Sequence, residues 1–162
     1  MHTHLTMAGT ALKLHDGSID AVDLVSTAIR KSRAARGIFI SFIEWAHDAA
    51  VESAHRRSLG APLGRLDGMP FAVKDMIDVA GSRTTAGSIT RIDSPPASRD
   101  AAVITAMRAV GMIPVGKTNL SEFAFSGLGL NPHFGTPTAD FDAAAPRAPG
   151  GSSSGSAIAV QR

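Results

Sequence analysis

Residues 68–75 read GMPFAVKD, and the short apolar run at residues 69–73 within them predicts a buried strand. A helical pattern over residues 101–110 and a second apolar run at residues 112–115 follow along the chain. A strand, a helix and a second strand in this order form the unit of a parallel α/β sheet. The sequence therefore predicts an α/β fold in which Lys74 stands at the end of a buried strand.

Two helices are expected upstream of this unit. The first begins after Ser18, which can cap it, carries Asp20 in its first turn and ends at Gly37. The second helix covers residues 41–57. Its apolar side consists of Phe42, Trp45, Ala49 and Val51.

The composition is that of a globular domain, and it excludes several classes of function. Of the 162 residues, 44% are hydrophobic and 19% are charged. The net charge of +2 comes without a basic run, so we expect no nucleic-acid partner. The absence of cysteine excludes disulfides, thiolate metal sites and cysteine nucleophiles. No apolar stretch reaches about 18 residues and the histidine spacing forms no ligand set, so we expect a cytoplasmic protein without a membrane span or a bound metal.

A phosphate-loop pattern at residues 111–118, GMIPVGKT, does not fit its context. A phosphate loop turns backbone amides inward around the phosphates, between a strand and a helix. Here the residues between the glycines are strand-like, and Pro114 has no amide to offer. We interpret the stretch as a helix end, a strand and then a charged turn that contains Lys117 and Asn119.

Residues 126–151 are rich in Gly and Pro, which predicts a long irregular loop. The loop ends in GGSSSGS at residues 150–156, and an apolar helix start follows at residues 157–160. Residues 151–155 fit the nucleophile pattern G-x-S-x-G, but the prolines before them exclude a central strand. No Asp, Glu or His follows Ser153 in this chain, so the nucleophile interpretation fails within it. A flexible linker, a capped helix start and an anion-binding loop remain compatible with the run.

Short blocks of sequence between residues 60 and 162 resemble the amidase signature family in order and spacing. The blocks are residues 68–75, 77–81, 84–88, 116–119, 122–124, 131–132, 134–135 and 149–157. The resemblance implies an amidase-signature-type α/β fold with a mixed, largely parallel sheet covered by helices, incomplete in these residues. It also implies one amidase domain, with a helical N-terminal segment at residues 1–60 and the start of the signature core at residues 61–162.

The resemblance further implies a hydrolase of amide bonds that uses a Ser–cisSer–Lys triad. Lys74 corresponds to the base and Ser152 to the bridging serine, whose peptide bond with Gly151 is cis in the family. The nucleophilic serine corresponds to a position beyond Arg162, so we expect residues 1–162 to be inactive alone. The implied substrate is a small-molecule amide, and no cofactor is implied.

The residue types suit this chemistry. A lysine can serve as a base where burial lowers its pKa, and the apolar residues 71–73 before Lys74 favour such burial. Ser152 is both a donor and an acceptor and can relay a proton. Ala124 and Ser126 correspond to a stretch that lines the substrate cleft in the family.

Two other functions remain open. The chain can be a non-catalytic binding or assembly module, prone to self-association through apolar surface that the rest of an amidase would cover. It can also be an anion-binding domain that uses the Gly-Ser run. Residues 139–147 depart from the commoner family pattern, which leaves this rim of the implied cleft open as well.

Overall fold

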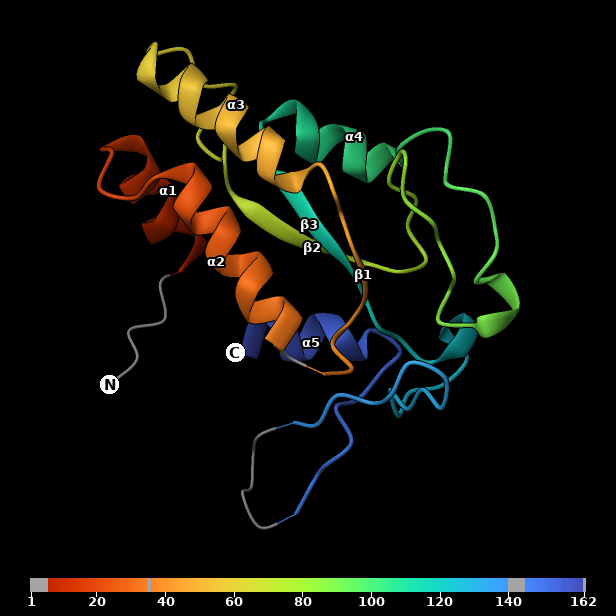
Figure 1. The fold of residues 1–162 in the computed structure, drawn as a ribbon. Coiled ribbons are helices and arrows are strands. Elements are labelled where there is room, and N and C mark those ends of the chain that lie inside the picture. The colour runs from red at the N-terminus through yellow and green to blue at the C-terminus, as the bar shows by residue number, and fades with distance from the viewer. Residues whose placement is uncertain (1–5, 35, 140–144, 162) are drawn as a thin grey trace.

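Three short strands form a mixed sheet at the centre of the computed structural model, which describes residues 6–34, 36–139 and 145–161 (Figure 1). The strands are β1 (Phe39–Phe42), β2 (Pro70–Lys74) and β3 (Ile113–Thr118). β3 lies between the other two, parallel to β2 and antiparallel to β1. The chain is thus an α/β protein, as predicted, with one of its two strand pairs parallel.

The predicted strand–helix–strand unit is confirmed. α4 (Ala102–Ala109) lies between β2 and β3 in the chain, and the two strands pair with Val73 opposite Lys117 and Lys74 opposite Thr118. Both strands run beyond their predicted ends. The expectation of a charged turn at Lys117 is wrong, because this residue stays paired with strands on both sides.

Helices cover both faces of the sheet. α2 (Ala21–Ala34) and α3 (Ala46–Ser58) pack against each other and against β3, whereas α5 (Ser154–Gln161) contacts β2 and β3 (Figure 1). The remaining elements are α1 (Met7–His15) and the 3-10 turns η1 (Ile89–Arg91) and η2 (Glu122–Ala124). Within the described ranges, no helix has the length and apolar character needed to cross a bilayer.

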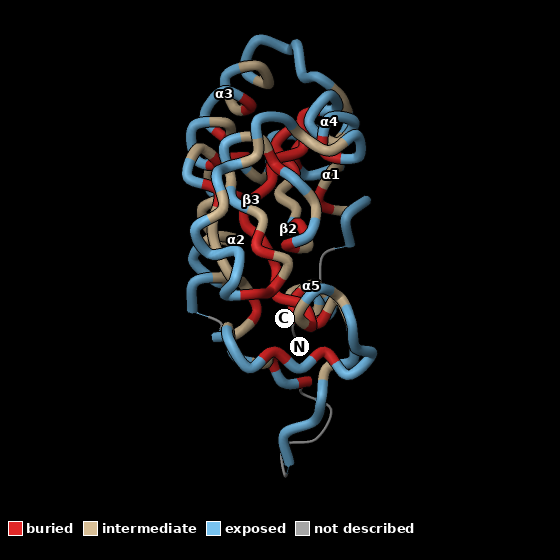
Figure 2. The backbone as a smooth tube through the Cα atoms, turned by 90° about the vertical axis from the view of Figure 1, so that its right-hand side faces the viewer, coloured by how far each residue is buried: buried red, intermediate tan, exposed pale blue. Residues whose placement is uncertain are grey.

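Alternation along the strands separates a core face from a polar face. Val73, Ile113 and Val115 pack with apolar side chains of α2, α3 and α4 in the main core. Figure 2 shows β3 buried along its course, and every residue of the strand is buried. The opposite face directs Lys74 and Thr118 toward the segment that carries Ser152 and Ser156.

The helix predicted at residues 41–57 is wrong at its start. Residues 39–42, Phe-Ile-Ser-Phe, form β1, and α3 begins only at Ala46. The aromatic and β-branched residues fit a strand, and the free side of β3 supplies the partner, so tertiary pairing overrides the helical pattern. The predicted apolar side is also shifted, because Ala46 and Ala50 are buried while Val51 is exposed.

The cap of α2 differs from the predicted one. The Asp20 carboxylate accepts hydrogen bonds from the backbone amides of Val22 (2.7 Å) and Asp23 (3.3 Å), which makes Asp20 the capping residue. Ser18 instead donates its amide to the carboxylate of Asp16 at 2.9 Å. The Asp20 carboxylate, two residues closer to the helix, therefore caps α2 in place of the Ser18 hydroxyl.

A buried carboxylate ties the N-terminal helices to the start of β2. The side chain of Asp67 is fully buried and accepts hydrogen bonds from Arg56 Nε (3.0 Å), Arg56 Nη2 (2.8 Å) and the Leu63 amide (2.9 Å). Arg57 donates to the carbonyl oxygens of Asp67 (3.0 Å) and Leu14 (2.9 Å). Burial alone raises the pKa of Asp67, but the hydrogen bonds from Arg56 and Leu63 and the positive charge of Arg56 lower it below the usual value.

Asp67→Asn is predicted to lower the free energy of unfolding by about 3 kcal/mol, since it leaves the Arg56 guanidinium without its carboxylate. The folded-state pKa of Asp67 lies below its unfolded value of 3.8, so its contribution to stability is present above that value and is lost as the pH falls through the folded pKa. Chemical denaturation across the acid range measures both effects. Asp48→Asn, at an exposed carboxylate of α3, is the matched control. Equal stability of the Asp67→Asn and Asp48→Asn variants at neutral pH would contradict this account.

Candidate functional site

The site lies where β2 ends and the serine-rich segment before α5 passes over it. Lys74 Nζ donates a hydrogen bond of 2.6 Å to Ser152 Oγ, across 78 residues of sequence. The Gly151–Ser152 peptide bond is cis, as the resemblance implied. The two residues expected to be base and bridging serine are thus in direct contact.

The sheet and the loop after β3 both hold this contact in place. Lys74 and Thr118 are partners across β2 and β3, and the hydroxyls of Thr118 and Ser156 lie 2.7 Å apart. The Ser121 amide donates to the Ser152 carbonyl oxygen at 3.1 Å. Ser156 on α5 is bonded to the sheet, and Ser152, just before α5, is bonded to the loop after β3. The Ser152 side chain therefore has a fixed position over Lys74.

Two glycines allow the serine-rich segment to approach so closely. A Cβ atom on Gly151 would lie 2.5 Å from the amide nitrogen of Gly129, and one on Gly155 would lie closer still to the carbonyl oxygen of Ile38. Both approaches are closer than any side chain tolerates, and the neighbouring atoms belong to the backbone. The glycines at these positions of GGSSSGS are therefore required by packing and not only by loop flexibility.

Burial lowers the pKa of the Lys74 ammonium group. The side chain is half-buried at the strand end, and desolvation lowers the pKa of its ammonium group from the usual value of 10.5. Its hydrogen-bond partner, Ser152, is a neutral hydroxyl, which offsets little of the desolvation. The uncharged amine is thus more accessible near neutral pH than that of a solvent-exposed lysine.

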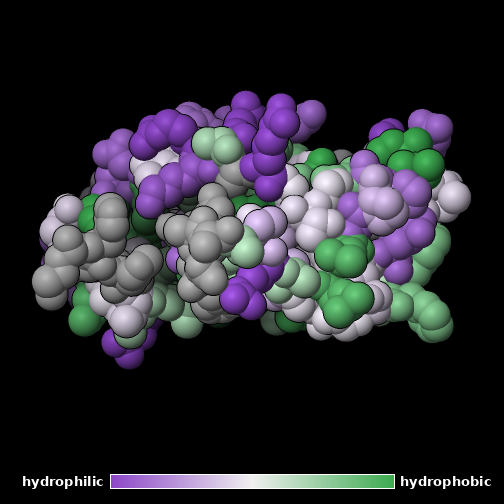
Figure 3. Space-filling model, turned by 90° about the horizontal axis from the view of Figure 1, so that it is seen from below, coloured by the Kyte–Doolittle hydropathy of each residue, from purple (hydrophilic) through white to green (hydrophobic). Residues whose placement is uncertain are grey.

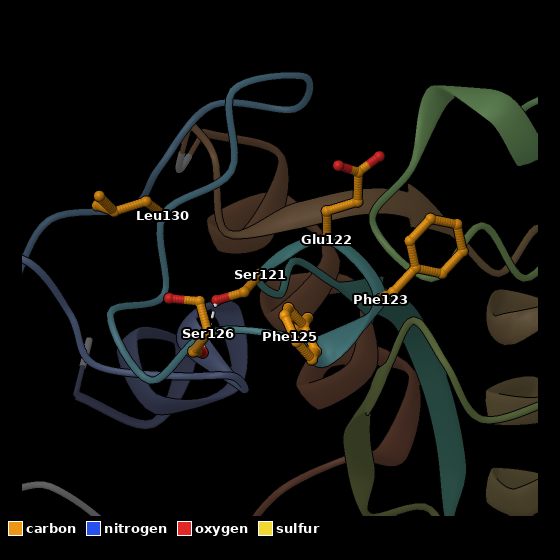
Figure 4. A pocket seen from close by; sticks show the side chains of 6 residues that line it. All are labelled: Ser121, Glu122, Phe123, Phe125, Ser126 and Leu130. Atoms are coloured by element: carbon orange, nitrogen blue, oxygen red, sulfur yellow. Dashed lines mark hydrogen bonds between the residues drawn. The ribbon is translucent and has the colours of Figure 1, made fainter.

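A hollow of about 470 Å³ lies at the loop that follows β3. Its lining residues are Ser121, Glu122, Phe123, Phe125, Ser126 and Leu130 (Figure 4). Ser121 donates its hydroxyl to the Ser126 carbonyl oxygen at 3.0 Å, and through its amide it joins the hollow to Ser152. Ser126, expected at a substrate cleft, lines the hollow, whereas Ala124 is not among the lining residues.

The backbone at the rim of the hollow is unusual. Phe123 and Ala124 have φ angles of 50° and 59°, in the left-handed region that non-glycine residues rarely adopt. The amide of Phe123 donates to the Ala86 carbonyl oxygen at 2.8 Å, and that of Ala124 donates to the Ser121 carbonyl oxygen at 2.7 Å. These bonds hold Phe123 and Ala124 in this backbone conformation.

Sequence reasoning missed the two other polar lining residues, Ser121 and Glu122. Hydrogen bonding to Ser88, together with His133 at 3.3 Å, lowers the pKa of the Glu122 carboxyl group below its usual value. The sequence did carry a signal for Glu122, because it is a charged residue within the largely apolar stretch of residues 120–125. Ser121 carried no such signal, because its role depends on the Ser152 carbonyl oxygen that lies far away in sequence.

The two misleading motifs have structural roles instead. Residues 113–118 of the phosphate-loop pattern form β3, and Lys117 makes an ion pair with Asp75, so the amides form sheet ladders and do not surround an anion. Ser153 precedes α5, where its carbonyl oxygen accepts the Ala157 amide.

No group of three potential metal-binding side chains comes together among the residues that the structure describes. His2, His4 and residues 140–144 of the possible cleft rim lie outside the described residues.

Comparison with known proteins places this chain in a family. Residues 21–162 match the sequence profile of the family named Amidase. The chain is 39% identical to a glutamyl-tRNA(Gln) amidotransferase subunit of Chloroflexus aurantiacus, over 97% of this chain and 32% of that protein. It is 33% identical to the 2-amino-5-chloromuconic acid deaminase of Comamonas testosteroni, over 97% of this chain and 35% of that protein.

The fold agrees with that assignment. The structure of peptide amidase from Stenotrophomonas maltophilia superimposes with a TM-score of 0.84 at 29% identity, over 98% of this chain and 34% of that chain. The chain therefore spans about a third of the length of the relatives that it matches. Family profile, sequence identity and fold agree, and the chain belongs to the amidase family.

Proposed function

We propose that residues 1–162 supply the base and the proton relay of an amide-hydrolysing site, with Lys74 as the base and Ser152 as the relay. The observation that supports this most directly is the 2.6 Å hydrogen bond between Lys74 Nζ and Ser152 Oγ, made by a half-buried lysine of lowered pKa. The nucleophilic serine of the proposed triad belongs to polypeptide outside these residues. The substrate class is a small-molecule amide, in keeping with the family.

The proposed reaction moves one proton along this contact. When Lys74 is uncharged, its amine accepts the proton of the Ser152 hydroxyl, while Ser152 accepts the proton of the nucleophilic hydroxyl. The nucleophile oxygen then bonds to the carbonyl carbon of the amide. The proton returns through Ser152 to the leaving nitrogen as the carbon–nitrogen bond breaks. Water hydrolyses the resulting ester by the same relay and restores the nucleophile.

A second function, as a binding or assembly module, is favoured by the surface next to the site. Phe125 is 94% exposed and Val160 on α5 is 87% exposed. Phe123, Leu128 and Leu130 are also exposed, and Figure 3, seen from below, shows apolar side chains at the surface among polar ones. β2 has no strand partner on its outer side within the described residues. Such an edge and such a surface associate readily with other chains.

Lys74→Ala is predicted to lower kcat by about 10²–10⁴-fold in an active amidase polypeptide that contains residues 1–162, because general-base catalysis is lost. Turnover should rise with pH through the Lys74 pKa, which lies below 10.5, since the uncharged amine is the active form. Steady-state kinetics over pH, with a thermal melt of each variant, measures both. Lys13→Ala, at the end of α1, is the matched control. Near-normal turnover of a folded Lys74→Ala variant would remove Lys74 from the mechanism.

The isolated residues 1–162 are predicted to self-associate through the apolar surface around Phe125. Sedimentation velocity over a range of concentrations should show species larger than a monomer. Phe125→Asp should shift this equilibrium toward the monomer, whereas Val51→Asp, at an exposed position of α3, should leave it unchanged. A monomer at every concentration, with a sharp and reversible thermal melt, would show that this surface does not drive association.

A further inference from the structure

A second lysine is buried more deeply than Lys74, on the other face of the same strand pair. Lys117 Nζ lies 2.9 Å from Asp75 Oδ1, and both side chains are fully buried. Lys117 Nζ also donates to Thr84 Oγ1 at 2.8 Å and approaches the Arg83 carbonyl oxygen at 3.3 Å. The ammonium group thus has one carboxylate and two neutral oxygens as its partners in the protein interior.

Stability alone is a poor explanation for this ion pair. Taking two charges out of water costs much of what their attraction returns, and apolar side chains of similar volume usually stabilise a fold equally well. In some proteins a buried ion pair is retained because it fixes one geometry, and not because it raises the free energy of unfolding. The place of the Asp75–Lys117 ion pair in the fold therefore indicates what it does, and Asp75 directly follows Lys74 in the chain.

The pair fixes the end of β2 from the face opposite to Ser152. Lys117 is the strand partner of Val73, so it faces the same side as Val73 and Asp75, whereas Lys74 points the other way. The Asp75 amide donates to the Thr118 carbonyl oxygen at 3.0 Å. The backbone on both sides of the peptide that joins Lys74 to Asp75 is thus held against β3.

The same carboxylate organises the turn at residues 84–87. Asp75 Oδ2 accepts the Thr85 amide at 3.0 Å and also the Thr85 hydroxyl, and the Asp75 carbonyl oxygen accepts the Ala86 amide at 2.8 Å. Lys117 holds the start of this turn through Thr84. Asp75 and Lys117 together therefore determine where the turn lies.

The turn at residues 84–87 also supports the loop that lines the hollow. The Ala86 carbonyl oxygen accepts the amide of Phe123, and the Gly87 carbonyl oxygen accepts Asn131 Nδ2 at 2.9 Å. Phe123 lines the hollow directly. A continuous set of hydrogen bonds thus runs from the ion pair to the residues beside the Lys74–Ser152 contact.

We infer that Asp75 and Lys117 are positioning residues, whose ion pair holds Lys74 against Ser152 and sets the loop at residues 122–126 beside them. The pair acts through the backbone of β2 and through the turn at residues 84–87, and neither side chain touches the proposed reacting atoms. This inference rests on the proposed role of Lys74, but it concerns the placement of the amine and can be tested without any hydrolysis.

The test is competitive acetylation of the chain with acetic anhydride across a range of pH, read for each lysine by mass spectrometry. The chain has four lysines, and Lys13 and Lys31 on the helices α1 and α2 serve as internal references. The main variant is Asp75→Asn/Lys117→Met, which removes both charges at once and leaves no unpaired buried ion. A change at Lys74 in this variant therefore reports a change of position and not a change of nearby net charge.

In the parent chain, Lys74 should become reactive at lower pH than Lys13 and Lys31. In the double variant the pH midpoint of Lys74 should rise toward those of the references by about one unit, as its amine moves from Ser152 into solvent. Arg56→Met/Asp67→Asn, which removes the ion pair before the start of β2, is the matched control and should leave the Lys74 midpoint unchanged. Circular dichroism establishes that each variant is folded.

Thr84→Val is a milder second variant, since it removes one acceptor of Lys117 and keeps both charges. It should move the Lys74 midpoint in the same direction by a smaller amount. A folded double variant in which Lys74 reacts as in the parent chain would overturn the inference. If the double variant does not fold, a folded Thr84→Val variant in which Lys74 reacts as in the parent chain would overturn it. If the midpoint shifts as expected while Lys74→Ala leaves turnover intact, the positioning role stands and the proposed catalytic role fails.

Discussion

The parallel pairing of β2 with β3 determines where the functional groups of the described residues lie. With Lys74 opposite Thr118 and Val73 opposite Lys117, the alternation of side chains sends one lysine to each face at the same level of the sheet. Thr118 reaches Ser156 on the face of Lys74, so α5 is held where Ser152 meets the amine. A register slip of one residue would exchange these faces and remove both the contact with Ser152 and the ion pair with Asp75.

The two lysines illustrate how the partner of a buried amine decides its chemistry. Lys117 makes an ion pair with the Asp75 carboxylate and donates to two further oxygens. Lys74 is met by a serine hydroxyl, and burial lowers the pKa of its ammonium group. The same residue type thus has two different environments on the two faces of one strand pair, an ion pair at Lys117 and a neutral hydroxyl at Lys74.

The sequence predicted the elements that depend on local pattern. The strand before Lys74, the helix at residues 101–110 and the strand after it were foreseen, and the resemblance carried by GMPFAVKD and GGSSSGS paired Lys74 with Ser152. What could not be foreseen depends on distant partners. β1 forms because β3 offers a free side, and Lys117 is buried because Asp75 faces it across the strand pair. The role of Ser121 likewise requires the position of the Ser152 carbonyl oxygen.

The central claim is that Lys74 is held against Ser152 as an amine of lowered pKa. The most direct measurement is an NMR titration of the lysine side-chain nitrogens in the ¹⁵N-labelled chain, with and without Ser152→Ala. The account predicts that Lys74 titrates at lower pH than Lys13 and Lys31, and that Ser152→Ala changes the Nζ shift of Lys74 while those of Lys13 and Lys31 stay the same. A Lys74 resonance that titrates together with the exposed lysines and ignores the loss of the Ser152 hydroxyl would contradict it.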